Sequence, residues 1–155
     1  MTLTAWRICK RRYAATAFDG EGARFYGGRL SSKGFAVVYT AGSVALAALE
    51  MLVHLQSADV LARYVVRSAQ FDDSLVLDLD RRRLPKNWRQ SPTPRSAQRI
   101  GDAWIAGAES AVLRVPSAVI PSEDNYLLNP ARPDFRHIAF GPPQPFRFDP
   151  RLLKP

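Results

Sequence analysis

Cysteine and histidine are scarce in this chain, and their scarcity excludes several kinds of site. The 155 residues include one cysteine, Cys9, and two histidines, His54 and His137. An internal disulfide and a four-cysteine zinc site are therefore excluded, and a Ser-His-Asp triad has few ways to form. One cysteine fits a reducing compartment, so we expect a cytoplasmic protein.

Motifs for nucleotide-dependent and metal-dependent chemistry are also missing. The sequence has no GxGxxG after a predicted strand, no Walker A lysine loop, no HExxH and no GxSxG. Glu50 and His54 have the i,i+4 spacing with which one helix can hold a metal, but no third ligand is evident. We therefore expect no metal and no tightly bound cofactor.

An uninterrupted apolar run of membrane-spanning length is absent as well. The stretch from 35 to 55 is mostly apolar, but Gly42 and Ser43 divide it, and Glu50 and His54 lie in its second half. Its first half is aromatic and β-branched, whereas its second half is rich in Ala and Leu, which predicts a strand and then a helix. The first ten residues lack the apolar core of a signal peptide. We expect no membrane segment.

The residues that are present are those of a globular protein with a basic surface. Hydrophobic residues make up 46% of the chain and charged residues 23%, which predicts a single domain over residues 1–155. The formal net charge is +8. Such a surface attracts nucleic acid, an acidic protein or a phosphate-bearing ligand, and it also serves solubility alone.

Hydrophobic patterning predicts many short strands and two or three helices. Ser43 is a good N-cap for a helix, and a run rich in Ala and Leu follows it. The predicted strands are Ala5–Cys9, Phe35–Thr40, Leu61–Ala69, Leu75–Leu79, Ala111–Ile120, Arg136–Phe140 and Pro145–Phe148; the predicted helices are Val44–Leu55 and Arg95–Glu109; the predicted loops are Asp19–Arg29, Arg81–Pro94 and Ser122–Pro130. Strands and helices do not alternate regularly, so the pattern predicts an α+β fold rather than a doubly wound parallel sheet.

Glu50 is the residue with the strongest functional signal. On the predicted helix its neighbours Leu46, Leu49 and Val53 are apolar, and the helix is apolar nearly all round, which predicts burial. A buried carboxylate is unfavourable unless it is paired or opens into a cleft. Glu50 is therefore either a catalytic or ligand-orienting residue, or a buried Glu paired with an arginine.

The glycine-rich segment Gly22–Arg29 is a second candidate. Its glycines permit close approach by a ligand, while Arg24 and Arg29 can hold a pyrophosphate through paired N–H donors. An ordinary surface turn with solvated arginines explains the same residues.

Three further polar residues are candidates for the same site. Tyr39 ends the strand before the Glu50 helix, where it either stacks on a flat ligand or belongs to the core. Ser117 and Asn125 lie in apolar or turn surroundings, and the hydroxyl of Ser117 bonds either a ligand or backbone. The run 81–83 of arginines is read as a solvated face or a docking patch.

Taken together, these segments resemble the RES-domain family, named for its Arg, Glu and Ser. The matching stretches are AWRI (Ala5–Ile8), GARFYGGR (Gly22–Arg29), VVYTAGSVALAALEMLVH (Val37–His54), VPSAVIPSEDNYLLNP (Val115–Pro130) and FDPRLL (Phe148–Leu153). Their order and spacing cover nearly the whole chain. One departure is visible, because many relatives have Trp and Asn after the GGR, where this chain has Leu30 and Ser31.

The resemblance implies a fold, an activity and a partner. The implied fold is ADP-ribosyltransferase-like, a split and mostly antiparallel sheet with flanking helices and a cleft for NAD⁺. The implied protein is the toxin of a type II toxin–antitoxin pair that cleaves the nicotinamide–ribose bond of NAD⁺, its substrate, by hydrolysis or phosphorolysis, or that transfers ADP-ribose to a protein. The implied partner is an Xre-type antitoxin, with a homodimer within the complex as one arrangement and with nucleic acid bound only through the antitoxin.

Carried over by position, the family's functional residues fall on the candidates already named. Its arginines correspond to Arg7 and Arg29, its tyrosine to Tyr39, its glutamate to Glu50 and its serine to Ser117; Asn125 matches a recurrent asparagine of less clear role. The resemblance assigns Glu50 to the ribose and its developing positive charge, the arginines to the pyrophosphate, and Ser117 to the nicotinamide ribose.

A basic module that binds nucleic acid without catalysis is the rival interpretation. The charge of +8 and the 10% aromatic content permit it. Against it, the sequence contains no helix-turn-helix, RNP or zinc-finger pattern, and its arginines are spread along the chain.

Overall fold

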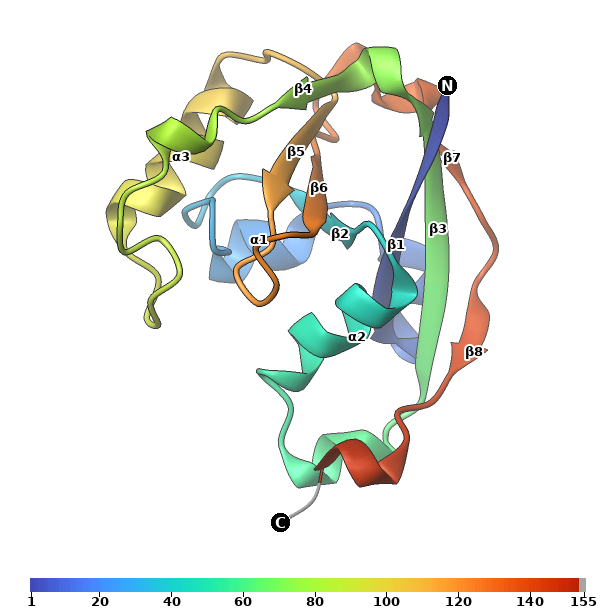
Figure 1. The fold of residues 1–155 in the computed structure, drawn as a ribbon. Coiled ribbons are helices and arrows are strands. Elements are labelled where there is room, and N and C mark those ends of the chain that lie inside the picture. The colour runs from blue at the N-terminus through green and yellow to red at the C-terminus, as the bar shows by residue number, and fades with distance from the viewer. Residues whose placement is uncertain (154–155) are drawn as a thin grey trace.

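A computed structural model describes residues 1–153, and its central feature is one curled sheet of eight strands (Figure 1). The strand order is β4-β5-β6-β2-β1-β3-β7, and β8 also pairs with β3. All pairings are antiparallel except β4 with β5, which is parallel. The strands are β1 (Thr2–Lys10), β2 (Val38–Ala41), β3 (Tyr64–Asp72), β4 (Val76–Asp78), β5 (Val112–Pro116), β6 (Asp124–Leu128), β7 (Ala139–Phe140) and β8 (Gln144–Phe146).

Within residues 1–153, three α-helices flank this sheet. They are α1 (Glu21–Tyr26), α2 (Val44–Leu52) and α3 (Arg95–Ala106), and short 3₁₀ turns supply several of the connections. In Figure 1, α3 lies at one end of the molecule and α2 in front of the strands, near the middle. The α+β prediction with a mostly antiparallel sheet is confirmed. No helix within residues 1–153 is long and apolar enough to cross a membrane.

The sheet is split between β1 and β2. β1 pairs with β3 continuously from Thr2 to Lys10, but among the described residues its register with β2 contains one pair, Trp6 with Ala41. β2 then pairs with β6 along its whole length. The strands diverge beyond Trp6, so the sheet opens on one side of this junction.

Three apolar clusters hold the helices and the sheet together around the split. Leu46 and Ala47 of α2 pack against Ile8 of β1 and Ala41 of β2. On the other side, α3 packs through Ala97, Ile100 and Trp104 against Leu30, Leu113 and Leu127. The α2 cluster therefore joins β1 to β2 across the split, the α3 cluster supports the β5 and β6 side, and a third cluster lies between the sheet and the segments that include Phe18 and Ile138.

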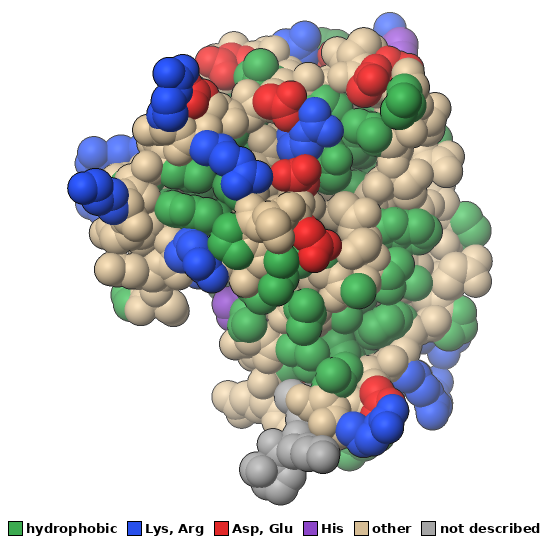
Figure 2. All heavy atoms as spheres, viewed as in Figure 1, with side chains coloured by type: hydrophobic (Ala, Val, Ile, Leu, Met, Phe, Trp, Pro, Cys, Tyr) green, Lys and Arg blue, Asp and Glu red, His purple; other side chains and the backbone are tan. Residues whose placement is uncertain are grey.

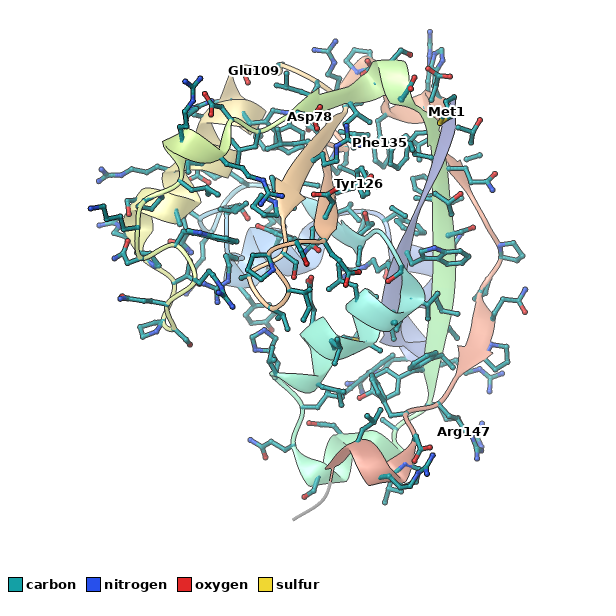
Figure 3. All side chains as sticks on the ribbon, in the orientation of Figure 1. Met1, Asp78, Glu109, Tyr126, Phe135 and Arg147 are labelled. Carbon is teal, nitrogen blue, oxygen red and sulfur yellow. The ribbon has the colours of Figure 1, made fainter. Side chains whose placement is uncertain are left out.

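The upper part of the sheet in Figure 3 is reinforced by charge. Arg114 of β5 forms an ion pair with Asp78 of β4, and its guanidinium lies 5.9 Å from the ring centroid of Tyr126 on β6. Short β4 is thus held to its parallel neighbour by side chains as well as by its backbone ladder.

The helix after Ser43 begins as predicted. The Ser43 hydroxyl accepts a hydrogen bond from the backbone N–H of Leu46 at 3.1 Å, which is the N-cap interaction that favours this residue. The helix ends at Leu52, three residues earlier than expected. The prediction that this helix is buried on all sides is wrong, because Leu49 is 40% exposed and the adjoining Val53 is 60% exposed.

Two segments predicted as loops are regular structure. Within Asp19–Arg29, the side chain of Asp19 accepts from the N–H of Glu21, and glycines with positive φ stand at both ends of α1, Gly20 at 76° and Gly27 at 74°. Local capping therefore makes a short helix out of a glycine-rich stretch.

Ser122–Pro130 contains β6, an interior strand of the sheet. Its Asp, Asn and Pro residues suggested a turn, but Tyr126, Leu127 and Leu128 are buried and β6 pairs on both sides, with β2 and β5. Burial against two neighbouring strands outweighs the local preference of the flanking residues.

Candidate active site

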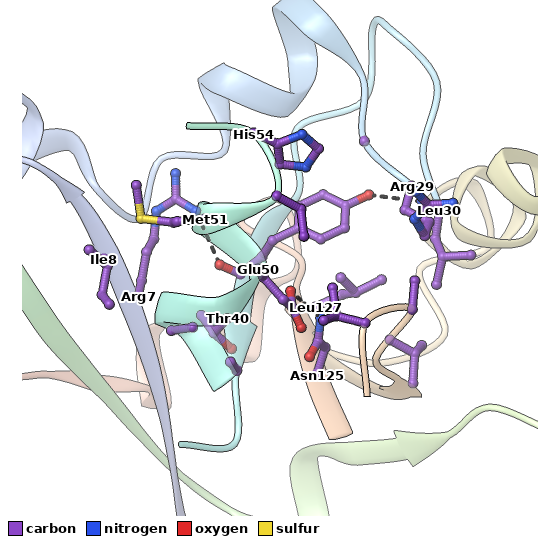
Figure 4. A pocket seen from close by; sticks show the side chains of 18 of the residues that line it. Arg7, Ile8, Arg29, Leu30, Thr40, Glu50, Met51, His54, Asn125 and Leu127 are labelled. Carbon is purple, nitrogen blue, oxygen red and sulfur yellow. Dashed lines mark hydrogen bonds between the residues drawn. The ribbon is translucent and has the colours of Figure 1, made fainter. Parts of the chain in front are cut away.

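A cleft of about 700 Å³ opens where the sheet splits (Figure 4). Five of the residues predicted for the site line it, contributed by β1, the Gly28–Arg29 turn, β2, α2 and β6: Arg7, Arg29, Tyr39, Glu50 and Asn125. The split and the packing of α2 beside it bring together side chains that are far apart in the sequence.

Glu50 is held at both of its carboxylate oxygens. The hydroxyl of Ser117 donates to Oε1 at 2.9 Å, and the amide nitrogen of Asn125 donates to Oε2 at 2.8 Å. Burial raises the pKa of Glu50 above its usual value, while these two hydrogen bonds and the charges of His54 and Arg29 oppose part of that effect. The result is a carboxylate with a fixed orientation in a partly desolvated cleft.

Ser117 stands behind Glu50 and does not line the cleft. Its side chain is fully buried, and its oxygen accepts hydrogen bonds from the N–H groups of Val119 and Ile120, both at 3.1 Å. With its proton donated to Glu50, the hydroxyl has no donor left for a ligand. The geometry makes Ser117 a support for Glu50, and the role expected for Ser117 in positioning the nicotinamide ribose stays a prediction.

Tyr39 forms part of the wall through its ring, because its hydroxyl is already bonded. That hydroxyl lies 2.6 Å from the hydroxyl of Ser31 and accepts from the N–H of Leu30 at 3.3 Å. Burial raises the pKa of Tyr39 to about 12, so the phenol stays protonated at neutral pH. The contact requires glycine at position 28, since a Cβ there would lie 2.4 Å from the Tyr39 hydroxyl oxygen.

Arg7 occupies the opening between β1 and β2. Its Nη1 donates to the carbonyl of Tyr39 at 3.1 Å, bridging the two diverging strands. Desolvation lowers the pKa of Arg7, which still remains charged. Two buried polar atoms in this region have no partner among residues 1–153, Nε of Arg7 and Oδ1 of Asn125. An unmatched donor and an unmatched acceptor suit a ligand that both accepts and donates hydrogen bonds.

The cleft lining also includes two residues that the sequence analysis did not place in the site. Arg89 comes from the segment predicted as a loop, and His54 lies one turn beyond Glu50. The basic composition of 81–94 was visible in the sequence, but only the fold shows which of its arginines reaches the cleft. Glu50 is the sole carboxylate among the lining residues, which otherwise carry the cationic side chains of Arg7, Arg29 and Arg89.

Arg24 is not brought to the cleft with the other candidates. Its Nε donates to Glu21 one turn earlier on α1 at 2.6 Å, and its guanidinium lies over the ring of Phe25. Helix formation by the segment directs this side chain along the helix surface. Within residues 1–153 no three His, Cys, Asp or Glu residues group closely enough to hold a metal ion.

The family model described as RES domain matches residues 4–149. The chain belongs to the RES-domain family. It is 41% identical over 148 residues to Toxin Res of Yersinia enterocolitica, covering 95% of this chain and 97% of that protein. It is 38% identical over 159 residues to the Prs ADP-ribosylating toxin of Sphingobium sp., covering 99% of each.

A solved structure supports the fold of this RES domain. The crystal structure of the M. tuberculosis MbcT–MbcA toxin–antitoxin complex contains a chain that superposes with a TM-score of 0.78 at 21% identity, covering 98% of this chain and 87% of that one. At this identity the likeness concerns the fold. The names of the curated relatives, together with the family match, make this chain a toxin of the RES type.

Proposed function

We propose that this RES-domain toxin cleaves the nicotinamide–ribose bond of NAD⁺, which it uses as a substrate. The observation that carries the proposal is Glu50, a carboxylate fixed at both oxygens in a cleft whose other charged lining residues are cationic. NAD⁺ has the matching charges, a negative diphosphate and a positive nicotinamide ring.

The chemistry needs one carboxylate. Departure of nicotinamide leaves positive charge on the ribose, and a preorganised negative group near that carbon stabilises the transition state more than the substrate. Glu50 supplies this charge, and Ser117 and Asn125 keep it in place. Nicotinamide is already a good leaving group, so no second carboxyl group is required as a general acid, in contrast to most glycosidases.

The remaining residues of the cleft bind the rest of the dinucleotide. The cationic side of the cleft faces the diphosphate, and the Tyr39 ring forms the wall against which nicotinamide or its ribose packs.

Water or phosphate captures the ribose in this proposal, which depletes NAD⁺ and arrests growth. Transfer of ADP-ribose to a protein is the second candidate, and the name of the Sphingobium relative favours it. The two candidates share the bond that breaks and differ in the acceptor.

We also propose that an antitoxin of the Xre type silences this cleft. The M. tuberculosis neighbour is a toxin–antitoxin complex. On α2, exposed Leu49 adjoins Val53, which lies in the cleft lining and is 60% exposed. Figure 2 shows apolar side chains gathered over the lower central part of this face, where Figure 1 places α2. An apolar rim beside a charged cleft suits a protein partner.

The decisive experiment measures NAD⁺ consumption by the purified chain, with and without phosphate. Glu50→Gln should lose most of the activity and remain folded, because the Gln oxygen still accepts from Ser117 and the Asn125 amide can turn its unpartnered Oδ1 toward the new N–H. Glu109→Gln is the matched control, since Glu109 is exposed and lies outside the cleft lining. Retained turnover in Glu50→Gln would contradict the proposal.

Labelled NAD⁺ incubated with cell lysate identifies the acceptor. Free labelled ADP-ribose or ADP-ribose phosphate supports hydrolysis or phosphorolysis, whereas label on a discrete protein band supports transfer. Co-expression with the antitoxin should relieve growth arrest, and continued arrest would remove the proposed partner.

A further inference from the structure

The position of Arg29 is fixed by backbone rather than by acidic side chains. Its Nη1 donates to two carbonyl oxygens, that of Trp88 at 3.0 Å and that of Gln90 at 2.8 Å. These carbonyls stand on either side of Arg89 in the sequence. Arg29 therefore holds the turn that carries a second cleft arginine.

Arg89 is anchored again at its own side chain. Its Nε donates to the carbonyl of Ala118 at 2.8 Å, while its two terminal nitrogens have no partner among residues 1–153. The residue is exposed and lines the cleft. One N–H of its guanidinium thus fixes the side chain, and the terminal nitrogens keep their four N–H donors for a ligand.

The anchor of Arg89 lies next to the support of Glu50. Ala118 follows Ser117 directly, and the N–H groups of Val119 and Ile120 bind the hydroxyl that holds Glu50. Arg29, the turn around Arg89 and the 117–120 segment consequently form one continuous set of hydrogen bonds along a wall of the cleft. The position of Arg89 is coupled to the position of the carboxylate.

We infer that Arg89 is the side chain that binds the diphosphate of the dinucleotide, and that Arg29 is a positioning residue that acts through the Arg89 turn. The inference rests on the proposed function. A guanidinium with two unused terminal nitrogens offers a paired set of donors to phosphate oxygens, which is the geometry that arginine provides best. Arg29 uses both N–H donors of Nη1 for carbonyls, so it lacks the pair of terminal nitrogens that Arg89 keeps and has only its Nε and Nη2 side left.

Loss of the Arg89 side chain should affect binding of the diphosphate and leave cleavage of the nicotinamide–ribose bond nearly unchanged. A diphosphate contact remote from the breaking bond is made in both the ground state and the transition state, so its loss raises KM and leaves kcat nearly unchanged. Nicotinamide riboside has the same scissile bond and no phosphate. Its cleavage should therefore be insensitive to removal of the Arg89 side chain.

The experiment compares Arg89→Ala, Arg89→Lys, Arg29→Ala and the double variant Arg29→Ala/Arg89→Ala. Arg83→Ala is the matched control, because Arg83 is exposed, precedes the same loop and makes no side-chain hydrogen bond among the described residues. The probes are ADP-ribose, titrated by calorimetry, and NAD⁺ and nicotinamide riboside as substrates. Circular dichroism and Tm confirm that each variant is folded.

Arg89→Ala should weaken ADP-ribose binding about 10-fold to 100-fold and raise KM for NAD⁺ similarly, with kcat within about twofold, because a charge-assisted hydrogen-bond pair is lost. Arg89→Lys should recover part of the loss, and Arg83→Ala should match the wild type. Because Arg29 acts through Arg89, the double variant should bind ADP-ribose no more weakly than the weaker of the two single variants.

Four results overturn the inference. Unchanged ADP-ribose affinity in Arg89→Ala would show that Arg89 does not bind the diphosphate. The proposed function would still hold in that case if the wild type cleaves NAD⁺. Losses that multiply in the double variant would show that Arg29 binds phosphate by itself. A fall in kcat with unchanged KM would mean that Arg89 acts by holding the 117–120 segment. If the wild type neither binds ADP-ribose nor consumes NAD⁺, the proposed function fails, and this inference with it.

Discussion

Replacement of Ser117 by alanine should move the pH dependence of activity. The Ser117 hydroxyl donates to Oε1 of Glu50 at 2.9 Å, and burial already raises the pKa of Glu50. Removing the donor withdraws a bond made to the ionised carboxylate, so the pKa of Glu50 rises further. If ionised Glu50 stabilises the ribose cation, the variant reaches full activity only at higher pH.

The size of this effect follows from the strength of the bond. A hydrogen bond to a charged group contributes about 1.5–3 kcal/mol, and the partial exposure of Glu50 favours the lower end of that range. Since about 1.4 kcal/mol corresponds to one pH unit, the acid limb of the profile should move up by about one pH unit. The N–H groups of Val119 and Ile120 also lose their acceptor, which should destabilise the fold by about 1–3 kcal/mol.

The assay is kcat/KM for NAD⁺ across the pH range, with Ser110→Ala as the matched control. Ser110 is also buried and also both donates and accepts, to the carbonyl of Val112 and from the indole nitrogen of Trp104. Ser110→Ala should lower Tm and leave the pH profile in place. A Ser117→Ala profile that falls uniformly, with its midpoint unmoved, would refute the role of Ser117 in fixing the charge of Glu50.

Three further changes have defined outcomes. The pKa of Glu50 is raised in the folded state, so Glu50 contributes stability that is present below its unfolded pKa and is lost as the pH rises through its folded pKa. Glu50→Gln should therefore become progressively more stable relative to the wild type as the pH rises above the unfolded pKa of Glu50. A Tm difference that changes in the opposite direction would contradict this. Gly101→Ala places a Cβ 1.7 Å from the carbonyl oxygen of Leu30 and should destabilise the fold by about 3 kcal/mol or more in denaturant unfolding. Gly22→Ala is the control, because a Cβ there has nothing within 4 Å, and it should be neutral or stabilising by up to about 1 kcal/mol. Equal effects of the two substitutions would disprove the tight contact at Gly101. Tyr39→Phe removes the acceptor of the Leu30 N–H and should lower Tm by several degrees and activity several-fold. The pH profile should keep its shape, because the Tyr39 phenol, with a pKa of about 12, does not titrate in the working range. Loss of an alkaline limb in the variant would argue for a titrating tyrosine.

The sequence predicted the elements whose signals are local. Ser43 and the Ala- and Leu-rich run after it defined the start of α2, because capping and helix propensity depend on neighbouring residues. The position of Tyr39 at the end of a strand before that helix suggested one shared cleft with Glu50, and both residues line it.

Sequence reasoning failed where distant segments decide the structure. β6 is a strand because β2 and β5 pair with both of its edges, and nothing between Ser122 and Pro130 reveals those neighbours. The role of Ser117 depends on Glu50, which is 67 residues away along the chain. Arg89 is one of several arginines in the predicted loop 81–94, and it lines the cleft because Arg29 binds the carbonyls on either side of it.

The split between β1 and β2 also has a consequence for association between molecules. Diverging strands expose backbone groups that an extended segment of another chain can pair with, which is how sheet edges lead to aggregation. Arg7 covers one of these groups, because its Nη1 takes the carbonyl of Tyr39 at the point where the backbone ladder ends. A charged side chain in that position repels an incoming apolar strand. We therefore expect Arg7 also to protect the opened sheet from self-association, and a neutral residue at position 7 should make the protein prone to aggregate.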